Sequence, residues 1–386
     1  MGAESGVLER VRRALLPVTG LPLLLGLAMG GLLLALWGRD IRSGAFLIGD
    51  CPYYASTAVS LWVDGDMNLE NQLRGGLAVH QKQVALGRRG EWFPKHPVLM
   101  SVLSVPFYAL FGIAGFLVFN ALVGLLLLTV VWALCRRFVG PPTATAATVL
   151  VFAGSFLRGY AYNYSPDLFS TLLVLAGILL IFGGRPFPGG ILLGVSVLAK
   201  VSNLFVAALV VTFLCFRRPR IGALAAGAGL LPGMAAWTIL NLAMFGSPTT
   251  TGYDRTLVLQ DGTVTTVSHR AFFDLPVWEG IRAQLIDPRV GLLTTSPLLL
   301  LALPGWVPLL KKHRWEGLLI LGLGEFLFLF FSTYRWWATS HYGNRFLMVP
   351  VCLCAVPMAF TLDALSQHLR GLVHARTAAP EPLRHR

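Results

Sequence analysis

Apolar runs long enough to span a membrane recur along the chain, and they leave little room for a soluble fold. A helix needs about twenty apolar residues to cross a bilayer core of roughly 30 Å. Runs near this length occur at 114–134, 166–183, 221–245 and 346–363, among others. Hydrophobic residues make up 55% of the 386 and charged residues only 13%, unlike a soluble globular domain. The sequence therefore predicts an all-α polytopic membrane protein.

The basic residues fall in short clusters between the apolar runs. The formal net charge is +13, and much of it lies in clusters such as CRRF (135–138), FRRPR (216–220) and KKHR (311–314). Such clusters are typical of cytoplasmic loops, so they indicate topology rather than a nucleic-acid-binding surface. The cysteines show neither metal-ligand spacing nor a disulfide framework. We interpret them as packing residues.

Placing the basic clusters in the cytoplasm arranges the apolar runs into about ten spans with both termini inside. No small-residue cleavage site follows the first run, so we expect an uncleaved helix rather than a signal peptide. The expected transmembrane domain, 1–365, has a large first outer loop at 38–96 and a second at 246–287, and the basic tail at 366–386 has a disordered composition. The expected spans cover 18–37, 114–134, 141–158, 166–183, 188–200, 201–216, 221–245, 290–310, 315–332 and 346–363.

The run at 97–113 allows two interpretations. It is apolar but short, and Pro106 interrupts it, so it fits either a thin span or a helix at the membrane interface. A span here would place the CRRF cluster outside, against the positive-inside rule. We therefore favour an interfacial helix that belongs to the large first outer loop.

With this topology, the unusual polar residues collect on the outer face. Acids, aromatic residues, arginines and histidines stand beside membrane helices there, a mixture that suits a ligand with an anionic head and a lipid tail. The candidate site residues are Asp50, Tyr53, Tyr54, Asp64, Asp66, Glu70, Lys95, His96, Asp167, Lys200, Tyr253, Asp254, Arg255, Arg335, His341 and Arg345.

Asp50 is the acid that most resembles a catalytic group. It lies in the apolar stretch AFLIGDCPYYA (45–55), where burial would raise its pKa toward that of a useful base. Asp64, Asp66 and Glu70 lie in the polar part of the same loop. Acids in loops are solvated by default, so we expect these three to shape the loop or to meet the acceptor. The same expectation covers Tyr53, Tyr54, Tyr253, Asp254 and Arg255.

The other candidates have both a structural and a functional interpretation. Asp167 follows a Ser-Pro pair at the start of a helix, which suits either the helix dipole or a site. Arg335, His341 and Arg345 stand among aromatic residues, as in a membrane-interface belt or in a phosphate site; we favour the phosphate. Lys200 falls within an apolar run, where charge is costly and often functional, and we expect it to reach the site.

Several of these features together resemble a known superfamily. An Asp shortly after the first span, an outer loop ending in KHPVLMSVLSVPFYALFG (95–112), a helix ending in CRRFVG (135–140) and the turn SPDLFSTLLVLAG (165–177) resemble the GT-C membrane glycosyltransferases. More narrowly, they are similar to the bacterial members related to protein O-mannosyltransferases and to lipid A aminoarabinose transferases. The resemblance covers about residues 10–365 and implies a GT-C-like helix bundle.

The resemblance implies an integral enzyme of the bacterial inner membrane. Such an enzyme takes a sugar from a polyprenyl-phosphate carrier and transfers it, with inversion, to a hydroxyl or amine of a lipid, glycan or protein acceptor on the outer face. By position, Asp50 corresponds to the first-loop Asp that acts as general base or orients the acceptor, and Asp167 to the acid of the second outer loop. Lys95 and His96 match the basic end of the first loop, near the donor phosphate.

The chain departs from many relatives at two places. Cys51 stands where they have a second acid directly after the first-loop Asp, and His96-Pro97 stands where they often have a Pro-Pro pair. These departures leave open which acceptor is used and whether a divalent metal takes part, and the sequence indicates no certain cofactor.

The chemistry of the proposed reaction agrees with this set of residues. Attack of an acceptor on the anomeric carbon needs a carboxylate to take a proton, and a departing polyprenyl phosphate needs cations to hold its charge. A transporter or flippase of lipid-linked sugars is an alternative, but it would place charged groups near the bilayer midplane. An O-antigen-ligase-like enzyme shares the outer Arg and His chemistry and stays open as well.

Overall fold

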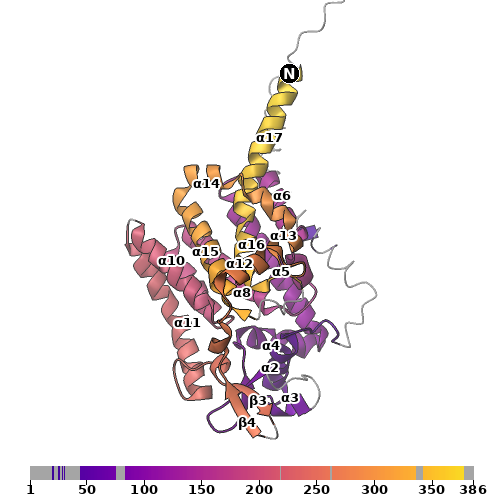
Figure 1. The fold of residues 1–386 in the computed structure, drawn as a ribbon, viewed down its shortest axis with the longest axis vertical. Helices are drawn as coiled ribbons and strands as arrows, with labels where there is room; N and C mark the ends of the chain where they lie inside the picture. Colours follow the sequence, from indigo (N-terminus) through magenta and orange to yellow (C-terminus); the bar gives the residue numbers. More distant parts are fainter. Residues whose placement is uncertain are drawn as a thin grey trace, which may run out of the picture.

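Helices dominate the computed structural model of the chain (Figure 1). The structure describes residues 44–74, 83–217, 219–260, 263–335 and 342–377, with residues 20, 25, 26, 28 and 30 before them. Most of the expected first span at 18–37 therefore lies outside the described residues.

Four described helical segments are long and apolar enough to cross a membrane. They are α5 (Ala114–Arg136), α11 (Ile221–Phe245), α15 (Arg314–Ser332) and Arg345–Gly371, which contains α16 (Met348–Leu353) and most of α17 (Ala355–Thr377). At a rise of about 1.5 Å per residue, such segments cover about 30–40 Å. They support an integral membrane protein, while a bundle of about ten spans stays a prediction.

Five shorter apolar helices fall on other expected spans and on the 97–113 run. They are α4 (Leu99–Phe111), α6 (Pro141–Ala153), α8 (Pro166–Phe182), α9 (Pro186–Val197) and α10 (Asn203–Phe216). Three of them, α6, α8 and α9, have proline in their first positions, where the missing N–H group has no helical partner to lose. Helix α8 is largely buried and packs against α5 and α9.

Helix α4 is too short for a full span. It has 13 residues with Pro106 inside, a length of about 20 Å, and it packs against α2 (Cys51–Val63) and α5. Helices α6 and α9 are equally short and fall on expected spans, so length does not decide between a thin span and an interfacial helix, and the interfacial interpretation of 97–113 stays a prediction.

Glycines let α9 and α11 pack with their backbones in contact. A Cβ atom added at Gly190 would overlap with the backbone of Ala226, and one added at Gly233 would overlap with the backbone of Gly194. Small residues at such positions are typical of helix pairs in membranes, because close approach increases van der Waals contact. The α9–α11 pair thus forms one wall of the bundle beside α8 and α10.

The expected single span at 290–310 is wrong in detail, because this run is broken into α13 (Leu292–Thr295), the 3-10 helix η4 (Pro297–Ala302) and α14 (Trp306–Lys312). Pro297 begins η4 and Pro304 precedes α14; proline lacks the N–H group that a continuous helix needs.

The expected disordered tail at 366–386 also needs correction. Helix α17 continues to Thr377, through a stretch that contains Leu, Gln and Arg, which are good helix formers. Residues 378–386 lie outside the described part of the chain.

The two loops that the sequence predicts to lie outside, 38–96 and 246–287, form a small sheet that the all-α expectation did not include. Strands β1 (Val84–Leu86), β2 (Trp92–Pro94), β3 (Thr256–Gln260) and β4 (Thr263–Val267) pair antiparallel in the order β2-β1-β3-β4. The segment 256–267 is rich in β-branched residues, which favour strands. Because Ala85 pairs with Thr256, the sheet joins the first outer loop to the second.

The sheet lies at one end of the molecule, together with α2 and α3 (Glu70–Arg74) (Figure 1). Helix α14, which ends in Lys311 and Lys312, lies at the opposite end. This separation agrees with the expected sidedness of the outer loops and the basic clusters. The remaining short elements are α7 (Leu157–Tyr160), η2 (Gly252–Asp254), η3 (His269–Phe272), α12 (Val277–Ile286) and η6 (Arg345–Leu347).

Candidate active site

A cavity of about 600 Å³ lies where the two outer loops meet the ends of the helices. Six separate parts of the chain contribute to it: the start of α2, the end of the first loop, the start of α8, the turn between α9 and α10, the second long loop and the segment between α15 and α16. Among the candidate residues, those that line it are Asp50, Tyr53, Tyr54, Lys95, His96, Asp167, Lys200, Tyr253 and Arg345.

Asp50 is presented to the cavity by a tight turn before α2. Gly49 has a φ of +63°, a left-handed conformation that glycine adopts without steric cost. Asp50 then takes the N-cap position of α2, but its side chain does not cap the helix. Instead, Asp50 Oδ2 accepts a hydrogen bond from Arg345 Nη2 at 2.6 Å, and Oδ1 accepts one from Gln83 Nε2 at 3.3 Å.

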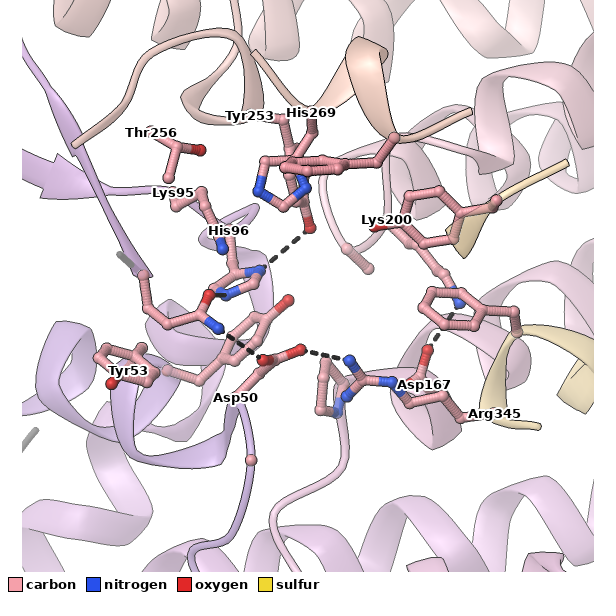
Figure 2. A pocket seen from close by; sticks show the side chains of 18 of the residues that line it. Asp50, Tyr53, Lys95, His96, Asp167, Lys200, Tyr253, Thr256, His269 and Arg345 are labelled. Atoms are coloured by element: carbon pink, nitrogen blue, oxygen red, sulfur yellow. Dashed lines mark hydrogen bonds and ion pairs between the residues drawn. The ribbon is translucent and has the colours of Figure 1, made fainter. Parts of the chain in front are cut away.

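Asp50 is the first group of an alternating series of charges (Figure 2). Arg345, paired with Asp50, also lies 3.8 Å from Asp167 through its Nε atom, and Asp167 pairs with Lys200 at 2.6 Å. The Lys200 ammonium stands 4.9 Å from the centre of the Phe346 ring, a cation–π contact. Four charges from distant segments are thereby held along one wall of the cavity.

The position of Asp167 at the start of α8 is compatible with both interpretations that the sequence suggested. Ser165 caps the helix by accepting a hydrogen bond from Leu168 N at 3.3 Å, and Asp167 lies in the first turn, where a negative charge is favoured by the helix dipole. Its side chain also lines the cavity and binds Lys200. The helix-dipole and site interpretations are therefore compatible.

A buried amide pair positions the segment that carries Arg345. Asn344 is fully buried, and its Nδ2 donates to Gln284 Oε1 at 2.8 Å while its Oδ1 accepts from Phe346 N at 3.1 Å. Gln284 is anchored in turn on Ser332 of α15 at 2.6 Å. These contacts fix the backbone on both sides of Arg345.

The pKa of Asp50 moves in the opposite direction from the sequence-based expectation. Burial raises the pKa of this carboxyl, as expected, but Arg345 and then His96 and Lys95 outweigh burial and hold the pKa well below its usual value. Asp50 is therefore ionised at neutral pH. Because its pKa is low, the Asp50 carboxylate is a weak base. It accepts hydrogen bonds and orients a partner more readily than it removes a proton from a free hydroxyl.

The two basic residues at the end of the first loop differ in charge. Burial lowers the pKa of Lys95 to about 8, although Asp50 opposes the shift, so Lys95 is cationic at neutral pH. Burial lowers the pKa of His96 to about 3, so this ring is neutral. His96 also packs between Tyr54, stacked at 5.0 Å, and Tyr253, edge-on at 5.6 Å.

The other candidates that the structure describes do not line the cavity. Asp64 accepts hydrogen bonds from Asn71 and Gln72, and Asp66 accepts them from Ser60 and Asn68, so both hold the first loop together, where Glu70 begins α3. Three other candidates also make contacts within the protein. Asp254 contacts Thr251 and Arg270, Arg255 donates to Leu86 O, and Arg335 pairs with Asp274. His341 lies outside the described residues. The roles that the sequence suggested for these residues stay predictions.

Several residues that line the cavity were absent from the sequence-based set, including Gln83, Thr256, His269 and Phe272. Gln83 carries no sequence signal, because it acts through contacts with Asp50, 33 residues away, and His96, 13 residues away. His269 lies in the expected second outer loop, where its residue type was the only signal that could have marked it as a candidate.

The cavity does not offer an evident metal site. Within the described part of the chain, no three His, Cys, Asp or Glu side chains cluster so as to hold a metal ion. Both carboxylates that line the cavity, Asp50 and Asp167, are engaged by cationic side chains. The side chains that line the described cavity therefore do not fit a bound divalent ion.

Comparisons with known proteins identify a similar fold. No protein-family model matches the chain, and no curated protein sequence matches it significantly. The crystal structure of ArnT from Cupriavidus metallidurans bound to undecaprenyl phosphate has a TM-score of 0.58 and 14% identity, and the match covers 92% of this chain and 62% of ArnT. The apo structure of the same protein has a TM-score of 0.56 and 15% identity, with the same coverage. The chain thus spans less than two thirds of the length of ArnT, and its fold resembles that of ArnT, which confirms the GT-C resemblance at the level of the fold.

Proposed function

We propose that the chain is an inverting membrane glycosyltransferase that moves a sugar from a polyprenyl-phosphate carrier to an acceptor hydroxyl or amine. We place it in a bacterial inner membrane with its cavity open to the outer face. The fold supports this proposal, since the ArnT structure with a similar fold is bound to undecaprenyl phosphate. Because the sequence identity to ArnT is only 14%, the activity has to be argued from the cavity itself.

The charges of the cavity suit a phosphodiester. The cations that line it within the described residues are Lys95, Lys200 and Arg345, and the carboxylates are Asp50 and Asp167, which leaves an excess of one positive charge at neutral pH. The lining histidines add none, because burial lowers the pKa of His96 to about 3 and that of His269 to about 4. A sugar linked to a polyprenyl phosphate through a phosphodiester carries one negative charge and would balance this excess.

Arg345 also offers a donor for a phosphate oxygen. Its Nε atom is buried and has no hydrogen-bond partner among the described residues, although Asp167 lies 3.8 Å away. A buried N–H group without an acceptor is costly. A phosphate oxygen would supply that acceptor once the side chain of Arg345 turns this N–H group toward the cavity, and arginine is well suited to phosphate.

The residues can support a single displacement. The acceptor oxygen or nitrogen forms a bond to the anomeric carbon on the face opposite the phosphate, and the bond from that carbon to the phosphate oxygen breaks. The electron pair leaves with the polyprenyl phosphate, whose charge Lys95, Lys200 and Arg345 would stabilise. The acceptor proton passes to Asp50 as the new bond forms, because bonding to carbon makes the acceptor atom positively charged and acidic enough for a weak base.

The observation that carries the proposal is the ionised Asp50 held beside Arg345 at 2.6 Å, in a cavity that also contains Lys95 and Lys200. One group that accepts a proton thus stands next to several that bind an anion. This arrangement matches the two requirements of transfer from a phosphate-linked sugar.

The test is transfer by the purified protein in proteoliposomes, supplied with a panel of undecaprenyl-phosphate hexoses, pentoses and aminopentoses and with bacterial envelope lipids as acceptors. We expect one donor to be consumed with release of undecaprenyl phosphate. Asp50→Asn should lower the rate by about 100-fold or more, because the proton acceptor is lost. Glu279→Gln is the matched control, since Glu279 is exposed on α12, outside the cavity.

Full activity of Asp50→Asn would contradict the proposed reaction. Movement of an intact lipid-linked sugar across the bilayer without transfer would instead support a flippase. Transfer only from a lipid pyrophosphate would favour the ligase-like alternative.

A further inference from the structure

A continuous chain of hydrogen bonds runs from the second outer loop to Asp50. Tyr253 OH lies 3.0 Å from His96 Nδ1, and His96 Nε2 lies 3.1 Å from Gln83 Oε1. Gln83 Nε2 then donates to Asp50 Oδ1 at 3.3 Å. The four side chains come from η2, from the end of the first loop, from the residue before β1 and from the residue before α2 (Figure 2).

The ionised Asp50 sets the direction of every bond in this chain. A carboxylate only accepts hydrogen bonds, so the amide nitrogen of Gln83 must face Asp50 and its carbonyl oxygen must face His96. That oxygen also only accepts, so His96 carries its proton on Nε2. A neutral ring then has a bare Nδ1, which accepts from the Tyr253 hydroxyl.

The protonation of the side chains agrees with these directions. Burial holds His96 neutral, with a pKa of about 3. Burial also raises the pKa of Tyr253 well above its usual value, so its hydroxyl keeps the proton that it donates. Both ring nitrogens of His96 are engaged in the chain, which leaves neither for the donor phosphate that the sequence-based interpretation assigned to it.

The surrounding packing leaves His96 little freedom to turn. The ring is 8% exposed and lies between Tyr54 and Tyr253. The close approach of η2 depends on Gly252, because a Cβ atom there would stand 2.6 Å from Lys95 Cα. Tyr253 reaches His96 because the residue before it, Gly252, has no side chain.

We infer that Gln83, His96 and Tyr253 are positioning residues that hold the Asp50 carboxylate in one orientation for sugar transfer, an inference that rests on the proposed function. Arg345 fixes one oxygen of Asp50 and Gln83 fixes the other. The chain also ties this orientation to the second outer loop, because Tyr253 belongs to η2, next to strand β3. The Asp50 carboxylate therefore takes the orientation needed for the reaction only when the second outer loop packs against the first outer loop.

The first test reads the proton on His96 and needs no substrate. Protein labelled with ¹⁵N-histidine is placed in lipid bilayers, and the His96 signal is identified by its loss in His96→Gln. We expect a neutral ring protonated on Nε2 at neutral pH in the wild type. In Tyr253→Phe and in Gln83→Leu, the preference for this tautomer should weaken, because one partner that selects it is missing. A wild-type ring that is protonated on Nδ1, or on both nitrogens, would overturn the inference.

The second test is a double-mutant cycle on kcat, measured with the donor that the wild type uses. Gln83→Leu should lower kcat by about 10- to 100-fold, as for a hydrogen bond to a charged group, and Tyr253→Phe by about 2- to 10-fold, as for a neutral one. The KM for the donor should change little in either variant. Tyr253 acts through Gln83, so the double variant should be no slower than Gln83→Leu alone.

The control and the outcomes keep this inference separate from the proposed function. Tyr342→Phe removes a hydroxyl from a tyrosine outside the cavity lining and should keep the wild-type kcat. The positioning role would be overturned if the reductions in kcat of the two single variants multiply in the double variant, or if Gln83→Leu keeps the full kcat. The proposed transfer activity would stand in both cases. If the wild type transfers no sugar, the proposed function fails, and the histidine spectrum still decides whether the hydrogen-bond chain exists.

Discussion

Arg345 decides how Asp50 behaves. Taken alone, a buried carboxyl gains a higher pKa, and the apolar stretch around Asp50 suggested a base of that kind. The guanidinium arrives from a position 295 residues later in the chain and pairs with Asp50 at 2.6 Å. The carboxylate therefore stays ionised, and its part in the proposed reaction is to orient the acceptor and take the proton late.

Lys95 gives the cavity a charge that depends on pH near the physiological range. Burial lowers its pKa to about 8, so the ammonium is present below that pH and is lost above it. If Lys95 binds the donor phosphate, the KM for the donor should rise as the pH increases through about 8. Steady-state transfer kinetics between pH 6 and about 9.5 measure this effect.

Lys95→Arg provides the control for this pH dependence. A guanidinium keeps its proton throughout this range, so the rise of KM near pH 8 should disappear in the variant, whatever its absolute KM. The same rise in Lys95→Arg as in the wild type would assign the titration to another group.

At the level of elements, glycines decide which helices touch. Gly227 and Gly233 both lie on α11, but a Cβ atom at Gly227 would meet nothing within 4 Å, whereas one at Gly233 would overlap with the backbone of Gly194 on α9. The two positions have the same residue type and lie on the same helix, so only their tertiary contacts differ.

Alanine at these two glycines should therefore have opposite effects on stability. We expect Gly233→Ala to destabilise the fold by about 1–3 kcal/mol, because it forces α9 and α11 apart. Gly227→Ala should be neutral or stabilising by up to about 1 kcal/mol, because alanine favours helix more than glycine does. Thermal unfolding of both variants in the same detergent measures the difference. Equal unfolding temperatures would argue against the close α9–α11 contact.

The sheet is the element that the sequence-based interpretation missed. The segment TLVLQDGTVTTV (256–267) has an aliphatic stretch before an Asp-Gly pair and a β-branched run after it, which is a strong hairpin signal. Apolar runs of membrane length do not reveal this hairpin, because its strands of five residues fall far below that length. The pairing of β1 with β3 has no local signal, since it joins segments from two different loops.

At the level of the whole molecule, the outer loops and the basic clusters lie at opposite ends (Figure 1). Asp66 in the first loop and Lys311 at the end of α14 are both exposed. With the outer loops outside the cell, a membrane-impermeant maleimide should label Asp66→Cys in intact cells and Lys311→Cys only after the membrane is opened. Cys215, which is exposed, is replaced by serine in both variants to remove its own labelling.

Protection of Asp66→Cys in intact cells, or labelling of Lys311→Cys there, would reverse the topology. It would also move the cavity to the cytoplasmic face. The proposal of transfer on the outer face would then fail, even if the chemistry of the cavity is correct.

The sequence by itself determined the mostly helical membrane fold and marked many of the residues that line the cavity. Hydrophobicity and proline positions are local properties, so they predicted the apolar helices and the start of α8. Charges in apolar surroundings are costly wherever they occur, so the sequence alone marks Asp50 and Lys200 as candidates, and the aromatic residues around Arg345 mark it as a candidate for phosphate binding. Only the tertiary structure decided that Asp50 is ionised, that Gln83 belongs to the site and that two loops share a sheet. Each of these depends on contacts between segments far apart in the chain, and the position of such segments relative to one another follows from the packing of the whole bundle.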